Sequence, residues 1–155
     1  DKPERLVGIH YFNPVAKMEL VEIVSGKKTS ESVTKNAIAF VKQIGKLPLP
    51  VTSTPGFLVN RVLTPYLLEA VELLEEGIPP AVIDKAAKDF GMPMGPIELA
   101  DTVGLDICLS VGENLTQYFG GRVPARLKQM VTDGHLGRKT GKGFYEYKLG
   151  KPQKI

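Results

Sequence analysis

The chain has 155 residues, of which 43% are hydrophobic and 24% charged, and its formal net charge is +3. This length suffices for one domain with a buried core, and the composition is typical of a globular protein and not of a disordered chain. The 20 basic residues are spread along the whole sequence, so we expect no nucleic-acid partner. No apolar run approaches the ~18 residues that a membrane-spanning helix needs, so we expect no membrane span.

Cys108 is the single cysteine, which excludes an internal disulfide and fits a reducing, intracellular compartment. No group of cysteine and histidine residues has the spacing of a metal site. The sequence enters a strand-like run within ten residues and ends in the polar stretch "YKLGKPQKI". Both ends suggest a piece of a longer protein.

Two short strands joined by a turn are predicted at residues 5–12 and 18–24, which are rich in β-branched and aromatic residues and flank the sequence "NPVAK". Side chains of a strand alternate between its two faces, so His10 shares a face with Gly8 and Phe12, and Glu22 has a comparable place on the second strand. A hairpin would therefore bring His10 and Glu22 together.

Helical spacing follows in "KTSESVTKNAIAFVKQIG", with Thr29 or Ser30 as the cap and Gly45 as the stop. The sequence "KLPLPVTS" is expected to be extended. Its two prolines restrict it to a sheet edge or a connector.

The longest periodic segment is "TPGFLVNRVLTPYLLEAVELLEEG". It predicts a central helix with Thr54 as N-cap, Pro55 in the first turn, a kink near Pro65 and Gly77 just past the end. Four further helical segments are predicted in "IPPAVIDKAAKDFG", "GPIELADTVG", "LDICLSVGENLTQYFG" and "VPARLKQMVTDG". The run "GRKTGKGFYEYK" then returns to a glycine-rich turn and a short extended piece.

His10 has two interpretations: a half-buried histidine at a strand end, or a catalytic base. A neutral imidazole acts as a base only if an acid holds its other nitrogen in the donor tautomer. Glu19 and Glu22 are the available acids, and only Glu22 shares the strand face with its apolar neighbours. A carboxylate there is partly desolvated, which is costly unless it is paired with His10.

Two other features also have a functional and a plain interpretation. Asn60, near the start of the central helix, either satisfies the backbone or Arg61, or presents its amide to a ligand oxygen. The sequence "GRKTGKGF", residues 137–144, forms either an anion-binding turn or a solvated basic turn. It is not a phosphate loop, and no G-x-G-x-x-G fingerprint occurs in the chain. His135 is expected to be a loop residue.

Four blocks in order, "GIHYFNPVAKMELVEIV", "TPGFLVNRVLTPYLLEA", "FGMPMGPIELADTVGLD" and "GRKTGKGFYEY", resemble the 3-hydroxyacyl-CoA dehydrogenase family, particularly its form in multifunctional fatty-acid oxidation proteins. The resemblance implies a mainly α fold, a helical bundle of the 6-phosphogluconate-dehydrogenase C-terminal-like type, preceded by two short strands left from a truncated Rossmann domain. It places those strands in residues 1–27, a helical substrate-binding and dimerisation domain in 28–150, and a tail or linker in 151–155.

The same resemblance implies an NAD-dependent enzyme of β-oxidation that oxidises (S)-3-hydroxyacyl-CoA to 3-ketoacyl-CoA. By position, the catalytic histidine falls on His10 and its acidic partner on Glu22. A substrate-contacting asparagine falls on Asn60, and positions that touch NAD fall on Asn13 and Lys139. The dinucleotide fingerprint is expected upstream, so that most of the NAD contacts come from the missing part of the Rossmann domain.

The partners that the resemblance implies are acyl-CoA, the chain's own upstream Rossmann domain and a second copy bound through the helical domain. A substrate-contacting serine of the family is also expected upstream, so we expect the isolated chain to be inactive. The alternative is a non-catalytic helical association module. The compartment expected is the bacterial cytoplasm, or else a mitochondrial or peroxisomal matrix.

Overall fold

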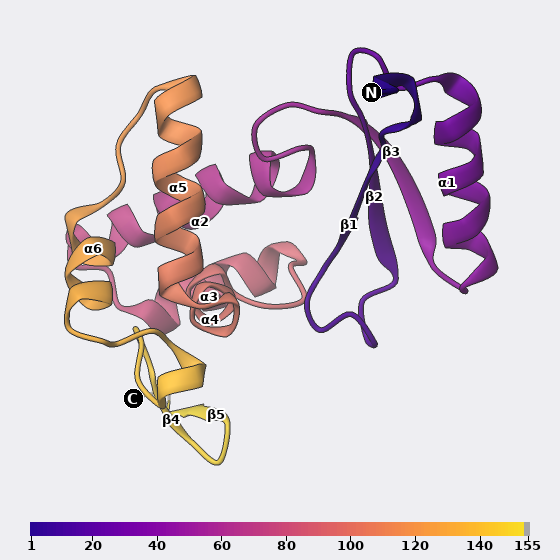
Figure 1. Ribbon diagram of the computed structural model, residues 1–155. Coiled ribbons are helices and arrows are strands. Elements are labelled where there is room, and N and C mark those ends of the chain that lie inside the picture. The colour runs from indigo at the N-terminus through magenta and orange to yellow at the C-terminus, as the bar shows by residue number, and fades with distance from the viewer. Residues whose placement is uncertain (154–155) are drawn as a thin grey trace. The chain divides into compact units, whose positions relative to one another are not determined.

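The computed structural model describes residues 1–153 of the chain. It divides into two compact units, Asp1–Leu58 and Val59–Ile155, whose elements are labelled in Figure 1. Each unit has its own hydrophobic core.

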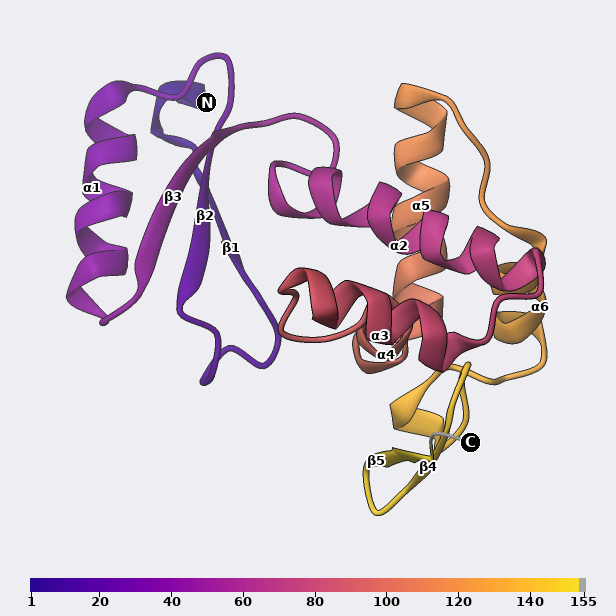
Figure 2. The ribbon, with the colours of Figure 1, turned by 180° about the vertical axis from the view of Figure 1, so that it is seen from behind.

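The first unit is a small mixed sheet with one helix. After the 3-10 turn Pro3–Arg5 come strands β1 (Gly8–Tyr11) and β2 (Leu20–Ser25), helix α1 (Glu31–Gln43) and strand β3 (Leu47–Thr52). The strand order is β1-β2-β3, with β1 antiparallel and β3 parallel to β2. Figures 1 and 2 show α1 lying along one side of the three strands. The predicted hairpin is confirmed.

The boundary expected after residue 27 differs from the division that the structure shows. Helix α1 packs on β2, because Ala37 and Val41 form a buried core with Val21 and Ile23. Strand β3 pairs with β2 along its whole length, so the sheet has three strands where two were expected. The two prolines of β3 are tolerated because it lies at an edge of this three-stranded sheet, where a missing N–H costs no ladder bond.

Helix α1 begins and ends as predicted. Ser30 is its N-cap and accepts a hydrogen bond at Oγ from the Val33 N–H, at 3.4 Å. Gly45 follows the helix with φ +75°, a left-handed conformation that glycine adopts without a steric penalty.

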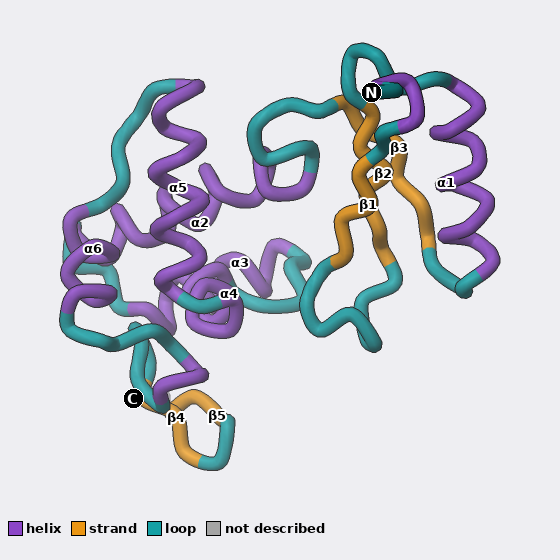
Figure 3. Tube along the Cα trace, viewed as in Figure 1, coloured by secondary structure: helices purple, strands orange, loops and turns teal. Residues whose placement is uncertain are grey.

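The second unit is a helical bundle, purple in Figure 3, followed by a small hairpin. Its helices are α2 (Val59–Glu75), α3 (Pro80–Phe90), α4 (Pro96–Val103), α5 (Leu105–Phe119) and α6 (Ala125–Thr132). A 3-10 turn (Arg138–Thr140) and strands β4 (Glu146–Lys148) and β5 (Lys151–Gln153) complete it. Helices α2 to α6 and the hairpin segment all contribute to the core, which consists of Leu67, Ala70, Val71, Leu74, Ile83, Ile97, Ala100, Leu105, Cys108, Leu127 and Tyr145. The mostly helical fold class is confirmed.

The predicted start of the central helix was wrong. Helix α2 begins at Val59 and not after Thr54, because Gly56 and Phe57 have φ values of +72° and +47°, which a right-handed helix cannot contain. Residues 151–153, assigned to a tail, form β5 and pair with β4; residues 154–155 lie outside the described part. Among the described residues, no helix is long and apolar enough to span a membrane.

Candidate active site

His10 and Glu22 face each other across the β1–β2 hairpin, where they are cross-strand partners. The His10 Nδ1 lies 2.8 Å from the Glu22 Oε2. Glu22 is fully buried, whereas the His10 side chain is 33% exposed. Because a carboxylate only accepts, the neutral imidazole donates from Nδ1 and carries its lone pair on Nε2. The pair therefore has the arrangement that a general base requires.

A backbone amide holds the second carboxylate oxygen of Glu22. The Leu58 N–H donates to Oε1 at 2.9 Å, so the buried charge receives hydrogen bonds on both oxygens, which offsets part of its desolvation cost. Sequence reasoning missed Leu58, since a turn amide has no side-chain signature. The one available signal was Gly56, which lies next to the predicted helix start and indicates a turn there.

Two aromatic rings contact the His10 imidazole edge to face. The Phe12 and Phe57 ring centroids lie 4.8 and 5.5 Å from that of His10, with interplanar angles of 64° and 62°. Such T-shaped contacts are the favoured geometry of aromatic pairs. The two phenylalanines thus place apolar surface beside the His10 ring, whose cross-strand partner is the buried carboxylate of Glu22.

Of the five predicted site residues, the structure brings His10 and Glu22 together. Asn13 is exposed, just beyond β1 in the same unit. Asn60 is half-buried and is the second residue of α2, in the other unit. Lys139 also belongs to that second unit, within the glycine-rich turn.

Lys139 forms an ion pair with Asp106 at the start of α5, with Nζ 2.5 Å from Oδ1. The hydrogen bond from Lys139 is the largest cause that lowers the pKa of the Asp106 carboxyl below its usual value. Both side chains are partly exposed, so the pair is screened by solvent and contributes little stability. Lys139, which was predicted to touch NAD, therefore connects the glycine-rich basic turn to α5.

Two buried aspartates that the sequence analysis did not single out hold the C-terminal segment in place. Asp84, on α3, accepts hydrogen bonds from the Ile97 and Glu98 N–H groups at 2.8 and 3.1 Å, and so caps the start of α4. The Tyr145 hydroxyl donates to the same carboxylate at 2.8 Å. A carboxylate on the apolar face of the α3 segment, next to Ile83, was the signal in the sequence.

Asp101, on α4, accepts three hydrogen bonds from the same C-terminal segment. The Phe144 and Tyr145 N–H groups donate to it at 2.9 Å each, and the Tyr147 hydroxyl at 3.1 Å. Burial nevertheless raises the pKa of Asp101 above its usual value. These hydrogen bonds attach the C-terminal segment to α4.

The described residues contain no other centre with obvious chemistry. No group of three or more His, Cys, Asp or Glu side chains is placed to hold a metal ion within them. Burial raises the pKa of the Cys108 thiol to about 12, so this cysteine stays protonated and is not a nucleophile.

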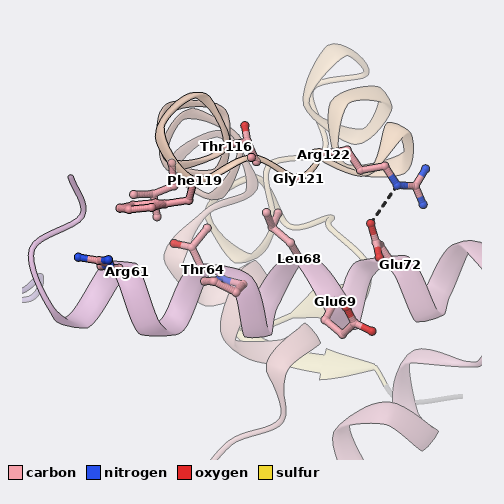
Figure 4. Close-up of a pocket in the computed structure, with 12 residues that line it drawn as sticks. Arg61, Thr64, Leu68, Glu69, Glu72, Thr116, Phe119, Gly121 and Arg122 are labelled. Atoms are coloured by element: carbon pink, nitrogen blue, oxygen red, sulfur yellow. Dashed lines mark hydrogen bonds and ion pairs between the residues drawn. The ribbon is translucent and has the colours of Figure 1, made fainter.

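A groove in the second unit lies between α2 and the end of α5 (Figure 4). The Arg61 guanidinium carbon lies 4.4 Å from the centre of the Phe119 ring. At the other end, the Arg122 Nε donates to a Glu72 carboxylate oxygen at 3.1 Å. Leu68 lies between them on the floor of the groove (Figure 4). None of the predicted site residues lines this groove.

Two family models match the chain. Residues 1–54 match the 3-hydroxyacyl-CoA dehydrogenase NAD binding domain, and residues 56–147 match the 3-hydroxyacyl-CoA dehydrogenase C-terminal domain. The fatty acid oxidation complex subunit alpha of Vibrio campbellii is 44% identical over 157 aligned positions, which cover 100% of this chain and 22% of that protein. The chain thus spans about a fifth of the length of this relative.

Solved structures show the same likeness. The (S)-3-hydroxybutyryl-CoA dehydrogenase of Ralstonia eutropha is 42% identical with a TM-score of 0.90, over 96% of this chain and 54% of that one. The 3-hydroxybutyryl-CoA dehydrogenase of Escherichia coli is 38% identical with a TM-score of 0.91, over 100% of this chain and 34% of that one. The chain therefore belongs to the NAD-dependent 3-hydroxyacyl-CoA dehydrogenase family, of which it contains part of the NAD-binding region and the C-terminal domain.

Proposed function

We propose that this chain is the C-terminal portion of an NAD-dependent (S)-3-hydroxyacyl-CoA dehydrogenase of fatty-acid β-oxidation, which forms 3-ketoacyl-CoA. The observation that carries the proposal is the His10 imidazole, partly exposed and hydrogen-bonded at Nδ1 to the buried Glu22. The relative from Vibrio campbellii, a fatty acid oxidation complex subunit of a bacterium, supports the pathway. For the location we keep the expectation of a bacterial cytoplasm.

His10 acts in this proposal as the general base. Its Nε2 accepts the proton of the substrate's 3-hydroxyl group, and the Glu22 carboxylate stabilises the imidazolium that results. A positioned proton transfer of this kind contributes about 10² to 10⁴ in rate. The Phe12 and Phe57 rings, in T-shaped contact with the imidazole, limit how it can turn while it changes charge.

Asn60 is the proposed contact to the substrate oxygen. Its side-chain amide can donate a hydrogen bond, and it lies in the first turn of α2, two residues after the amide that holds Glu22. A donor aligned on the oxygen where charge develops typically contributes about 3–4 kcal/mol to transition-state stabilisation.

When bound, NAD supplies the acceptor for the hydride that leaves C3 of the substrate. The exposed amide of Asn13 and the partly exposed ammonium of Lys139 fit contacts to a polar, anionic cofactor. Lys139 would have to share its hydrogen bonds between that cofactor and Asp106. We assign the remaining cofactor contacts to the upstream Rossmann region.

The experiment that tests this function is His10→Gln in the full-length protein, followed by NADH absorbance with a 3-hydroxyacyl-CoA substrate. We expect turnover to fall by about 10² to 10⁴ with the KM for NAD nearly unchanged. His135→Gln, in a loop of the second unit, is the matched control and should retain turnover. Wild-type turnover in the His10 variant would refute the assignment of the base.

The alternative function is a helical association module. It is favoured by exposed apolar side chains in the second unit: Val62 is 67% and Phe119 51% exposed. Sedimentation of the chain together with an acetoacetyl-CoA and NADH assay separates the two. A stable dimer without turnover supports association by this chain and leaves the dehydrogenase proposal to the full-length protein.

A further inference from the structure

The backbone of Phe57 is in an unusual conformation. Its φ is +47°, in the left-handed region that side-chain-bearing residues rarely adopt, and among the described residues only Leu149 shares this property. Gly56 beside it, with φ +72°, tolerates the region at no cost, but Phe57 does not. Strained residues of this kind cluster at functional sites, where the surrounding structure holds them in place.

The turn that contains Phe57 makes two contacts to the proposed catalytic pair. The next amide, Leu58 N–H, donates to the buried Glu22 carboxylate at 2.9 Å. The Phe57 ring contacts the His10 imidazole edge to face, with 5.5 Å between centroids. One short turn thus contacts the acid through its backbone and the base through its side chain.

The ring also borders a hollow of the first unit. This hollow is lined by apolar residues, including Leu6, Val7 and Val24, and by the turn at residues 26–29, of which 26–28 are exposed. Loss of the ring would therefore enlarge a space that is open to water next to the imidazole. Water there would compete for the hydrogen bond that fixes the tautomer of His10.

We propose that Phe57 is a positioning residue for the catalytic base. Its ring holds the plane of the His10 imidazole and keeps water from the bond to Glu22, while the left-handed turn directs the Leu58 N–H at the same carboxylate. This inference rests on the proposed function, since it assigns to Phe57 a part in the proton transfer by His10.

Three substitutions in the full-length protein separate the ring from the backbone. Phe57→Leu keeps apolar volume without a ring, Phe57→Tyr keeps the ring, and Phe57→Gly relieves the backbone while removing the ring. We expect the leucine and glycine variants to lose about 10- to 100-fold in kcat, as displaced catalytic groups do, with both KM values changed by less than about threefold. The tyrosine variant should retain kcat within about threefold. Phe40→Leu, at a half-exposed position of α1, is the matched control and should leave kcat unchanged.

Two results overturn the inference: kcat of Phe57→Leu and Phe57→Gly within about twofold of wild type, or a Phe57→Tyr variant as slow as Phe57→Leu. A loss of kcat that thermal denaturation explains by unfolded protein also counts against it. An inactive wild type would instead refute the proposed function. A crystal structure of Phe57→Leu is a separate test of the positioning role. If the His10–Glu22 distance is still 2.8 Å and the imidazole ring has not turned, Phe57 does not position His10.

Discussion

Glu22 illustrates how a single buried carboxylate can set the proton position on its neighbour. It is fully buried and accepts hydrogen bonds from two directions, the His10 imidazole and the Leu58 backbone amide. The Leu58 N–H can only donate, so the atom that faces it must be an acceptor. If Glu22 is changed to glutamine, the amide oxygen must therefore face the Leu58 N–H. The amide NH2 group then takes the place of the carboxylate oxygen that faces His10.

Glu22→Gln is therefore expected to place the wrong tautomer on His10. With the amide oxygen held toward the Leu58 N–H, the amide NH2 faces the His10 Nδ1, which must then accept. The proton moves to Nε2, and the ring can no longer take a proton from substrate there. We expect kcat of the full-length protein to fall by about 10² to 10⁴, measured by NADH absorbance.

Glu19→Gln is the matched control for this substitution. Glu19 is exposed and precedes β2, and its backbone carbonyl accepts from the Leu47 N–H. Its side chain is therefore expected to be replaceable without loss of turnover. Equal losses in the two variants would mean that charge near the hairpin matters and that the tautomer of His10 does not.

At the scale of elements, alternation of side chains was enough to predict the hairpin and the pairing of His10 with Glu22. Period-two spacing placed His10 and Glu22 on matching faces, and the register confirms that they are partners. Helical spacing likewise predicted α1 and all five helices of the second unit. These predictions succeed because they depend on near neighbours in the sequence.

The features that the sequence did not predict depend on contacts between residues that lie far apart in the sequence. Parallel pairing of β3 with β2 needs α1 to cross over between them, and the left-handed turn before α2 depends on contacts that only the folded unit makes. The Leu58 amide joins Glu22 across 36 positions of sequence. Asp84 and Asp101 were missed for the same reason, since their partners lie on the C-terminal segment.

The network around Asp84 predicts how firmly the C-terminal segment is attached to the bundle. Tyr145→Phe removes one hydrogen bond to a buried carboxylate and leaves the two amide donors of α4 in place. A hydrogen bond to a charged group is worth about 1.5–3 kcal/mol. We expect the Tm of the chain to fall by roughly 3–12 °C in thermal denaturation.

Tyr118→Phe serves as the control for that loss. Tyr118 is 65% exposed near the end of α5. Removal of its hydroxyl group should therefore cost little stability, and the Tm should change by less than about 2 °C. If both variants have the Tm of the wild type, the Tyr145 hydroxyl does not secure the segment.

At the scale of the whole molecule, the chain contains the hydrogen-bonded pair His10–Glu22 and the helical domain. It spans about a fifth of the Vibrio campbellii relative and about half of the Ralstonia eutropha enzyme. Its helical unit also carries more apolar surface than its own core uses. Most apolar residues of α2 are buried or half-buried, yet Val62 is 67% exposed. Near the groove between α2 and α5, Phe119 is 51% exposed and is covered on one side by Arg61.

We expect a second copy of the protein to cover this surface, because exposed apolar side chains beside a groove are typical of association sites. Val62→Asp should then convert a dimer into a monomer in sedimentation velocity, since a carboxylate buried in an interface without a partner costs several kcal/mol. Val82→Asp, at a 54% exposed position on α3 away from the groove, should leave the dimer intact. A Val62→Asp protein that still sediments as a dimer would place the interface elsewhere, and a wild type that is monomeric at all concentrations would exclude self-association through α2.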